Sequence, residues 1–151
     1  MPGGLTVPSP FYRVTSKAII FDDAGRLVVV KNHHGDWELP GGGWEHDEDF
    51  SSGLAREIRE ELGVEVRTIG DICIMYRGCN ERRGFMTLRL VSPVILMSYD
   101  FRQGDDMQEI RHVLRREFLS MDFTASEGEI AAQVDKIWEY APAIDKIAPN
   151  L

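Results

Sequence analysis

The sequence has few cysteines, and their spacing gives them no obvious structural role. Its 151 residues include two, Cys73 and Cys79, six positions apart. Two thiols at this spacing are too few for a disulfide framework and do not form the ligand pattern of a zinc site. We therefore expect both cysteines to be reduced and to lie at core or edge positions of the fold.

Long hydrophobic runs are also absent. No apolar segment approaches the ~20 residues that a membrane-spanning helix needs. The first residues, MPGGLTVPSPFYR, carry prolines and glycines where a secretory signal needs an apolar core. These absences argue against a membrane protein and make the cytoplasm the expected location.

Positive charge is scarce as well. The chain has 17 Lys and Arg against 25 Asp and Glu, a formal net charge of −8 at pH 7. It would be repelled by a phosphate backbone, so no nucleic-acid partner is expected. The one basic cluster, Arg77, Arg82 and Arg83, flanks a predicted hairpin turn at 78–84. It suits contact with a phosphate-bearing small molecule, although arginines at a loop tip often only keep the loop solvated.

The composition that remains is that of one globular domain over residues 1–151, with 43% hydrophobic and 28% charged residues. The Asp-Asp-Ala-Gly sequence at 22–25 predicts a hairpin between two β-branched runs. Pro93 favours a bulge or an edge position in its strand, and residues 114–119 indicate neither helix nor strand. The strand-rich segments are 14–21, 26–30, 64–76 and 85–99.

Two helices are predicted. The last begins at Ser126, which forms a capping-box pattern with Glu129, and continues with apolar residues at helical spacing until Pro142. The other covers 50–62, with Asp49 as N-cap and Gly63 after the last apolar residue. One face of it is apolar, which would seat the helix on a core.

Beside that apolar face, Glu57, Glu60 and Glu61 span an arc of roughly 100°. Carboxylates at this spacing suit a divalent metal ion, but glutamates near arginines are more often a solvated face, and Arg56 and Glu60 form an ordinary i,i+4 pair. Glu57 and Glu61, however, are a like-charge i,i+4 pair, which is unfavourable unless a cation lies between them. The spacing by itself leaves both interpretations open.

The segment Gly42–Val64 resembles the Nudix box, G-x5-E-x7-R-E-U-x-E-E-x-G-U, where U is a bulky aliphatic residue. The approach at 37–42, Trp-Glu-Leu-Pro-Gly-Gly, is also similar to that of the family, whereas Asp47 stands where a glycine is common. A pattern with this many fixed positions is far more specific than a lone glycine motif. The fixed positions are filled by Gly42, Glu48, Arg56, Glu57, Ile58, Glu60, Glu61, Gly63 and Val64.

The resemblance implies an α/β (α+β) fold, the Nudix α/β/α sandwich with a mixed β-sheet between helices. It implies Mg²⁺ as cofactor, with Mn²⁺ as an alternative. The implied ligands are Glu57, Glu60 and Glu61, together with the backbone carbonyl of Gly41. Glu48 and Arg56 match positions that join the loop to the helix.

The implied activity is hydrolysis of a diphosphate linkage in a nucleoside diphosphate joined to another moiety, by attack of a metal-activated water on phosphorus. The general base is either a box glutamate or an acid from a later loop, for which Glu109 is the candidate, although an exposed acid at a strand start is an equally good description. The resemblance also allows a homodimer. A Nudix-fold module that binds a nucleotide without cleaving it is the alternative, and an isomerase of isopentenyl diphosphate is a remote one.

Substrate identity is less well indicated. Nudix ADP-ribose hydrolases carry a proline at the position of Cys79, and Nudix dinucleoside polyphosphate hydrolases carry a tyrosine at the position of Glu81. This chain has neither marker, so neither subfamily is supported. Aromatic and basic residues near the glycine turn suit stacking on a base or sugar and contact with phosphate. The predicted substrate contacts are Trp44, Tyr76 and Arg77, with Trp37 assigned to the core and His33 and His34 as loop residues near the cleft.

Overall fold

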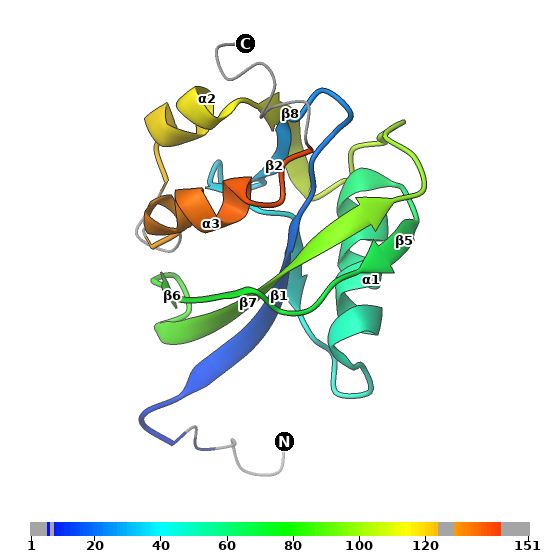
Figure 1. Ribbon diagram of the computed structural model, residues 1–151. Coiled ribbons are helices and arrows are strands. Elements are labelled where there is room, and N and C mark those ends of the chain that lie inside the picture. The colour runs from blue at the N-terminus through cyan, green and yellow to red at the C-terminus, as the bar shows by residue number, and fades with distance from the viewer. Residues whose placement is uncertain (1–5, 7, 124–128, 143–151) are drawn as a thin grey trace.

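The computed structural model describes residues 6, 8–123 and 129–142, and it places them in two β-sheets with helices on both sides (Figure 1). A single 3₁₀ turn, Ala131–Gln133, precedes the last helix. The strands are β1 Tyr12–Ile19, β2 Leu27–Asn32, β3 Trp37–Glu38, β4 Gly41–Gly43, β5 Val66–Ile69, β6 Ile74–Asn80, β7 Phe85–Leu96 and β8 Met107–Val113, and the helices are α1 Phe50–Leu62, α2 Arg115–Ser120 and α3 Val134–Trp138.

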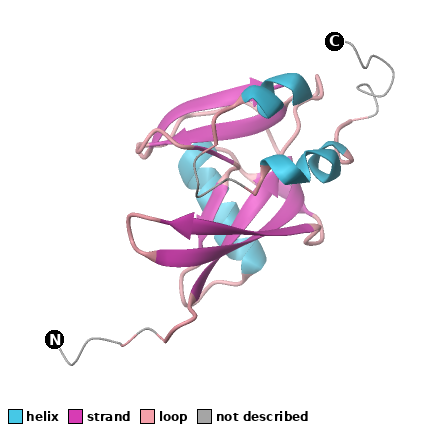
Figure 2. Ribbon diagram, turned by 90° about the vertical axis from the view of Figure 1, so that its left-hand side faces the viewer, coloured by secondary structure: helices cyan, strands magenta, loops and turns pink. Residues whose placement is uncertain are grey.

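The larger sheet is mixed. Its strand order is β4-β1-β7-β5. Strand β6 also pairs with β7, on the same edge as β5 but along a different part of it. β1 and β7 are parallel, whereas the other pairs are antiparallel. The smaller sheet, β3-β2-β8, is antiparallel, and Figure 2 shows its strands as a separate group.

Helices cover the two sides of this β-structure because consecutive residues of a strand point to opposite faces. Ala18, Ile20, Val28 and Val30 pack with α1, through its buried apolar side chains Leu54, Ile58 and Leu62. The alternate residues pack on the side of α2 and α3, in a core of Ile19, Phe21, Leu27, Val29, Trp37, Val113, Phe118 and Ile137. The predicted mixed β-structure between helices is therefore confirmed.

The hairpin predicted around Asp22–Gly25 forms, but it is shorter than the two β-branched runs that it joins. Gly25 has a φ of +75° and donates its N–H to the Asp22 carbonyl at 3.0 Å. Its arms are joined by the antiparallel bridge between Phe21 and Leu27 and by two backbone hydrogen bonds, from the Asp22 N–H to the Arg26 carbonyl at 2.9 Å and from the Val28 N–H to the Ile20 carbonyl at 2.8 Å. Beyond this short pairing, β1 and β2 enter different sheets. The reason is that both edges of β1 are occupied, one by β4 and the other by β7.

Other local predictions had mixed outcomes. Pro93 lies in β7, a central strand, rather than in an edge strand. It stands between the part of β7 that pairs with β6 and the part that pairs with β5, so its missing N–H breaks no continuous ladder. The segment 114–119 is helical, and Glu117 accepts the Leu114 N–H at 2.6 Å. The C-terminal helix is shorter than its apolar spacing predicts, and its proposed start at Ser126 lies outside the described residues.

Candidate metal and substrate site

Helix α1 carries the three glutamates of the candidate site, and its ends are those predicted. Asp49 accepts the Ser52 N–H at 2.8 Å as N-cap. Gly63 follows Leu62 with a φ of +69°, a left-handed conformation that glycine adopts without strain. The helix therefore begins and ends where its own residues cap it, and burial of Leu54, Ile58 and Leu62 sets the direction of its acidic face.

Arg56 lies at the centre of that face. Its guanidinium donates to Glu57 and to Glu60, each at 3.1 Å, and to Glu48, 3.0 Å from Nη2. It also donates to the Gly43 carbonyl at 3.0 Å, which joins the helix to the glycine turn. Hydrogen bonding to Glu48 raises the pKa of Arg56 and lowers the pKa of Glu48. Arg56 thus supplies a cation beside the like-charged glutamates.

Glu61 is the buried member of the three, with 6% of its surface exposed. Its Oε2 accepts the Gly41 N–H at 3.0 Å. Burial raises the pKa of Glu61 to about 8, although the nearby Lys17 ammonium and the Gly41 N–H oppose this shift. Without a bound cation, Glu61 therefore holds its proton to unusually high pH.

Lys17 is a buried cation beside this site that the sequence analysis missed. Its ammonium donates to the Leu39 and Gly41 carbonyls at 3.1 and 3.0 Å, and it lies 3.4 Å from Glu38. The signal was a lysine inside the apolar strand sequence VTSKAIIF, since lysine is rarely buried unless it is paired. Lys17 holds the segment before the box against β1.

Two glycines allow the close packing around the acids. A Cβ on Gly42 would lie 2.6 Å from the Glu57 carboxyl carbon, so any larger residue would displace that side chain. Gly41 has a φ of +129°, and a Cβ there would be 2.1 Å from the Ser16 carbonyl oxygen. Burial also raises the pKa of Glu57, which lies partly under this turn.

The acids open into a cavity of about 390 Å³, which we call the carboxylate cavity. Glu109, the predicted loop acid, is not among the residues that line it. Its carboxylate instead pairs with Arg111 at 2.7 Å. The turn before β8 contributes two other acids, Asp105 and Asp106, to the lining. The lining residues are Asn32, His33, Glu38, Gly42, Glu57, Glu60, Glu61, Arg83, Asp105, Asp106 and Met107.

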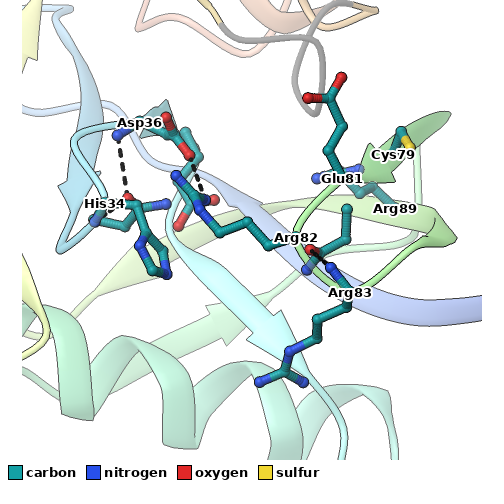
Figure 3. A pocket seen from close by; sticks show the side chains of 10 residues that line it. His34, Asp36, Cys79, Glu81, Arg82, Arg83 and Arg89 are labelled. Atoms are coloured by element: carbon teal, nitrogen blue, oxygen red, sulfur yellow. Dashed lines mark hydrogen bonds and ion pairs between the residues drawn. The ribbon is translucent and has the colours of Figure 1, made fainter.

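A larger cavity of about 550 Å³ adjoins it, and we call this the arginine cavity (Figure 3). Arg82 reaches across it to Asp36, at 3.2 Å. Arg89, on the central strand β7, is 6% exposed, and its guanidinium lies 5.6 Å from the centre of the Tyr76 ring. The lining residues are Asn32, His34, Asp36, Glu38, Cys79, Asn80, Glu81, Arg82, Arg83 and Arg89.

None of the three predicted substrate contacts lines either cavity. Trp44 packs edge-on against Phe50 at the start of α1, with ring centres 6.0 Å apart. Tyr76 is 3% exposed and belongs to the core. Arg77 points to Glu129, 3.2 Å away. Trp37 lies in the core as predicted. Tyr76 and Arg77 are consecutive in β6, so their side chains point to opposite faces, that of Tyr76 into the core and that of Arg77 toward Glu129.

The donor set fits a hard divalent cation, because Mg²⁺ and Mn²⁺ favour carboxylate oxygens in an open site. Among the described residues no three such groups already surround one point, so an ion would require side-chain rotation. Glu60, whose side chain is 58% exposed, has room for it. The Gly41 carbonyl accepts from the Lys17 ammonium, whereas the Gly41 N–H holds Glu61 in place. A ligand role for Gly41 stays a prediction.

Comparison with known proteins identifies the family. The family model of the NUDIX domain matches residues 11–142, so the chain belongs to that family. It is 35% identical over 80 residues to a MutT-like protein of Streptomyces ambofaciens, a match that covers 52% of this chain and 50% of that protein. It is also 37% identical over 76 residues to a CMP-5'-(N-acetyl-N-hydroxy-3-aminopropyl)phosphonate hydrolase of Streptomyces rubellomurinus, covering 46% of this chain and 37% of that protein. The chain thus spans about half or less of the length of these curated relatives.

Solved structures share the fold. The crystal structure of a MutT protein from Methanosarcina mazei Go1 matches with a TM-score of 0.73 at 23% identity, covering 83% of this chain and 94% of that one. Within the described ranges, no helix combines the length and the apolar character that crossing a bilayer requires. The family model thus identifies the family, and the solved structure shows the fold.

Proposed function

We propose that this protein hydrolyses a diphosphate linkage in a nucleoside diphosphate joined to another moiety, with Mg²⁺ or Mn²⁺ as cofactor. The observation that carries the proposal is the carboxylate cavity, which Glu57, Glu60 and Glu61 line beside a pocket lined by arginines. A cation bound there would offset phosphate charge and lower the pKa of a bound water.

In this proposal the chain itself positions the acids and accepts the proton. Arg56 orients Glu57 and Glu60, and the Gly41 N–H orients Glu61. Water oxygen forms a bond to phosphorus while the bridging P–O bond breaks, and the water proton passes to a carboxylate. Of the loop acids, Asp105 and Asp106 line the cavity, so they are better placed for this step than Glu109.

The alternative, a module that binds a nucleotide without cleaving it, predicts loss of the acids. This chain retains every fixed acid of the box, and their side chains lie in or beside one cavity. The names of two curated relatives, a CMP-linked phosphonate hydrolase and an RNA pyrophosphohydrolase, agree with hydrolysis. We therefore favour the enzyme.

A substrate screen tests the proposal. The protein would be incubated with nucleotide sugars, nucleoside and deoxynucleoside triphosphates, ADP-ribose and dinucleoside polyphosphates, each with Mg²⁺ or Mn²⁺, and the nucleotide products would be measured by anion-exchange chromatography. We expect turnover of at least one class, its loss with EDTA, and its recovery when Mg²⁺ is added in excess. Turnover that survives metal removal, or binding without turnover in every class, would contradict the proposal.

A further inference from the structure

The carboxylate cavity and the arginine cavity share three lining residues, Asn32, Glu38 and Arg83. Asn32 is committed to its own loop, because its side-chain oxygen accepts the His34 and Asp36 N–H groups. Glu38 lies 3.4 Å from the buried Lys17 ammonium. Arg83 is therefore the shared side chain with a charged group available to a ligand.

The charge of the carboxylate cavity makes this position important. Six of its lining residues are carboxylic acids: Glu38, Glu57, Glu60, Glu61, Asp105 and Asp106. Among the described residues that line it, Arg83 is the single permanently cationic side chain. A diphosphate carries several negative charges and would be repelled by these acids, so its binding needs cations that contact the diphosphate itself.

The turn between β6 and β7 sets the direction of Arg83. Its backbone N–H donates to the Asn80 side chain at 3.1 Å, and Gly84, with a φ of +73°, completes the turn. Arg82, the preceding residue, pairs with Asp36, and the side chains of Arg82 and Arg83 diverge (Figure 3). Arg83 extends away from that pair, and no described residue forms an ion pair with its guanidinium.

We infer that Arg83 binds a phosphate oxygen of the diphosphate linkage, and that the rest of the substrate lies in the arginine cavity. The inference rests on the proposed function and adds to it a residue outside the Nudix box. A guanidinium binds phosphate oxygens through paired N–H donors, which a metal ion on the carboxylate side would not replace. Arg83 would act in binding and positioning, since it has no part in proton transfer.

A binding measurement without turnover tests this inference. Imidodiphosphate, whose bridging nitrogen resists hydrolysis, would be titrated calorimetrically into the protein with Mg²⁺ present. We expect Arg83→Ala to weaken binding by about ten- to a hundredfold, as loss of a charged hydrogen bond does. Arg83→Lys should recover part of it. Arg67→Ala, which removes an exposed arginine on β5 away from both cavities, is the matched control and should bind like the wild type.

Equal affinity of the wild type and Arg83→Ala would overturn the inference, and so would a wild type that does not bind imidodiphosphate. Arg83 is exposed, so its variants should fold, which thermal melts would verify. Kinetics with the best substrate of the screen separate this result from the proposed function. A wild type that binds imidodiphosphate through Arg83 yet hydrolyses no substrate would refute only the enzyme, whereas an active enzyme with unchanged KM in Arg83→Ala would refute only the inference.

Discussion

The two cavities that meet at Arg83 are assembled differently. In the carboxylate cavity, Gly42 and the three glutamates of α1 come from one short segment of the chain. In the arginine cavity, residues 32–38 face residues 79–89, and the ion pair between Arg82 and Asp36 joins positions 46 residues apart. A local pattern can encode the three helical acids of the first cavity, because helical periodicity places them, whereas tertiary structure has to add Asp105 and Asp106 to that cavity and has to create the second.

Their electrostatics differ too. Glu61 is buried with a raised pKa, and Glu57 shares that shift. In the arginine cavity, Arg82 is about half exposed and paired. Exposed pairs contribute little to stability. Changes in the carboxylate cavity should therefore alter the chemistry and the pH dependence of folding, whereas changes in the arginine cavity should alter affinity.

The largest expected effect is on turnover in the carboxylate cavity. Glu60→Gln and Glu61→Gln should each reduce kcat at least a hundredfold while the fold is retained, because each removes the charge of a proposed metal ligand. Chromatography of the nucleotide products measures kcat, and circular dichroism verifies folding. Glu109→Gln is the matched control, since Glu109 pairs with Arg111 outside the cavity. Wild-type activity in both box variants would refute the metal assignment.

The next effect concerns the stability of the metal-free protein. The pKa of Glu61 is higher in the folded chain than its ordinary value of 4.5, so the folded state binds the proton more strongly and stability falls as pH rises from about 4.5 to about 8. From pH 5.5 to 7, Glu61 should account for a loss of about 2 kcal/mol. Denaturant unfolding of wild type and Glu61→Gln in EDTA measures this difference.

The two proteins should diverge in pH dependence over that range, with the wild type losing more stability than Glu61→Gln. Parallel curves would show that burial does not hold the proton on Glu61. Added Mg²⁺ should flatten the wild-type curve, since a bound cation stabilises the ionised carboxylate.

A smaller effect is expected at Trp44, which the sequence analysis predicted to contact substrate and whose ring packs against Phe50, the first residue of α1. Trp44→Ala should lower the free energy of unfolding by about 1–2 kcal/mol, because a partly buried aromatic contact with Phe50 is lost. The KM for the best substrate should stay unchanged. An increase in KM without loss of stability would return Trp44 to the substrate site.

The smallest effect is expected in the arginine cavity. Asp36→Asn breaks the pair with Arg82 and frees that guanidinium. We expect a change in KM of about two- to threefold with kcat retained, since an exposed ion pair contributes less than about 1 kcal/mol. A large fall in kcat would show that the two cavities are not separable in this way.

The helix that carries three acids of the carboxylate cavity followed from residues close together in the chain. The bounds of α1, its Asp49 cap and its Gly63 end were predictable because capping and apolar periodicity act within a few residues. Arg56 donates a hydrogen bond to Glu48, and this contact joins the loop to the helix as the resemblance to the Nudix box implied. The mixed β-structure between helices also followed, because strand and helix periods determine which faces must be buried.

Tertiary structure alone decided the strand partners and the second cavity. A turn between two β-branched runs could not reveal that β1 would pair with β7 instead of β2, since pairing depends on distant segments. Successive side chains of β6 point to opposite faces of the sheet, and that of Tyr76 points into the core. Only the packing of the whole sheet decides which of the two faces is buried. Arg83 was one arginine of a cluster in the sequence, and its place between the two cavities depends on β6 and β7 packing beside residues 32–38, a contact that no local pattern encodes.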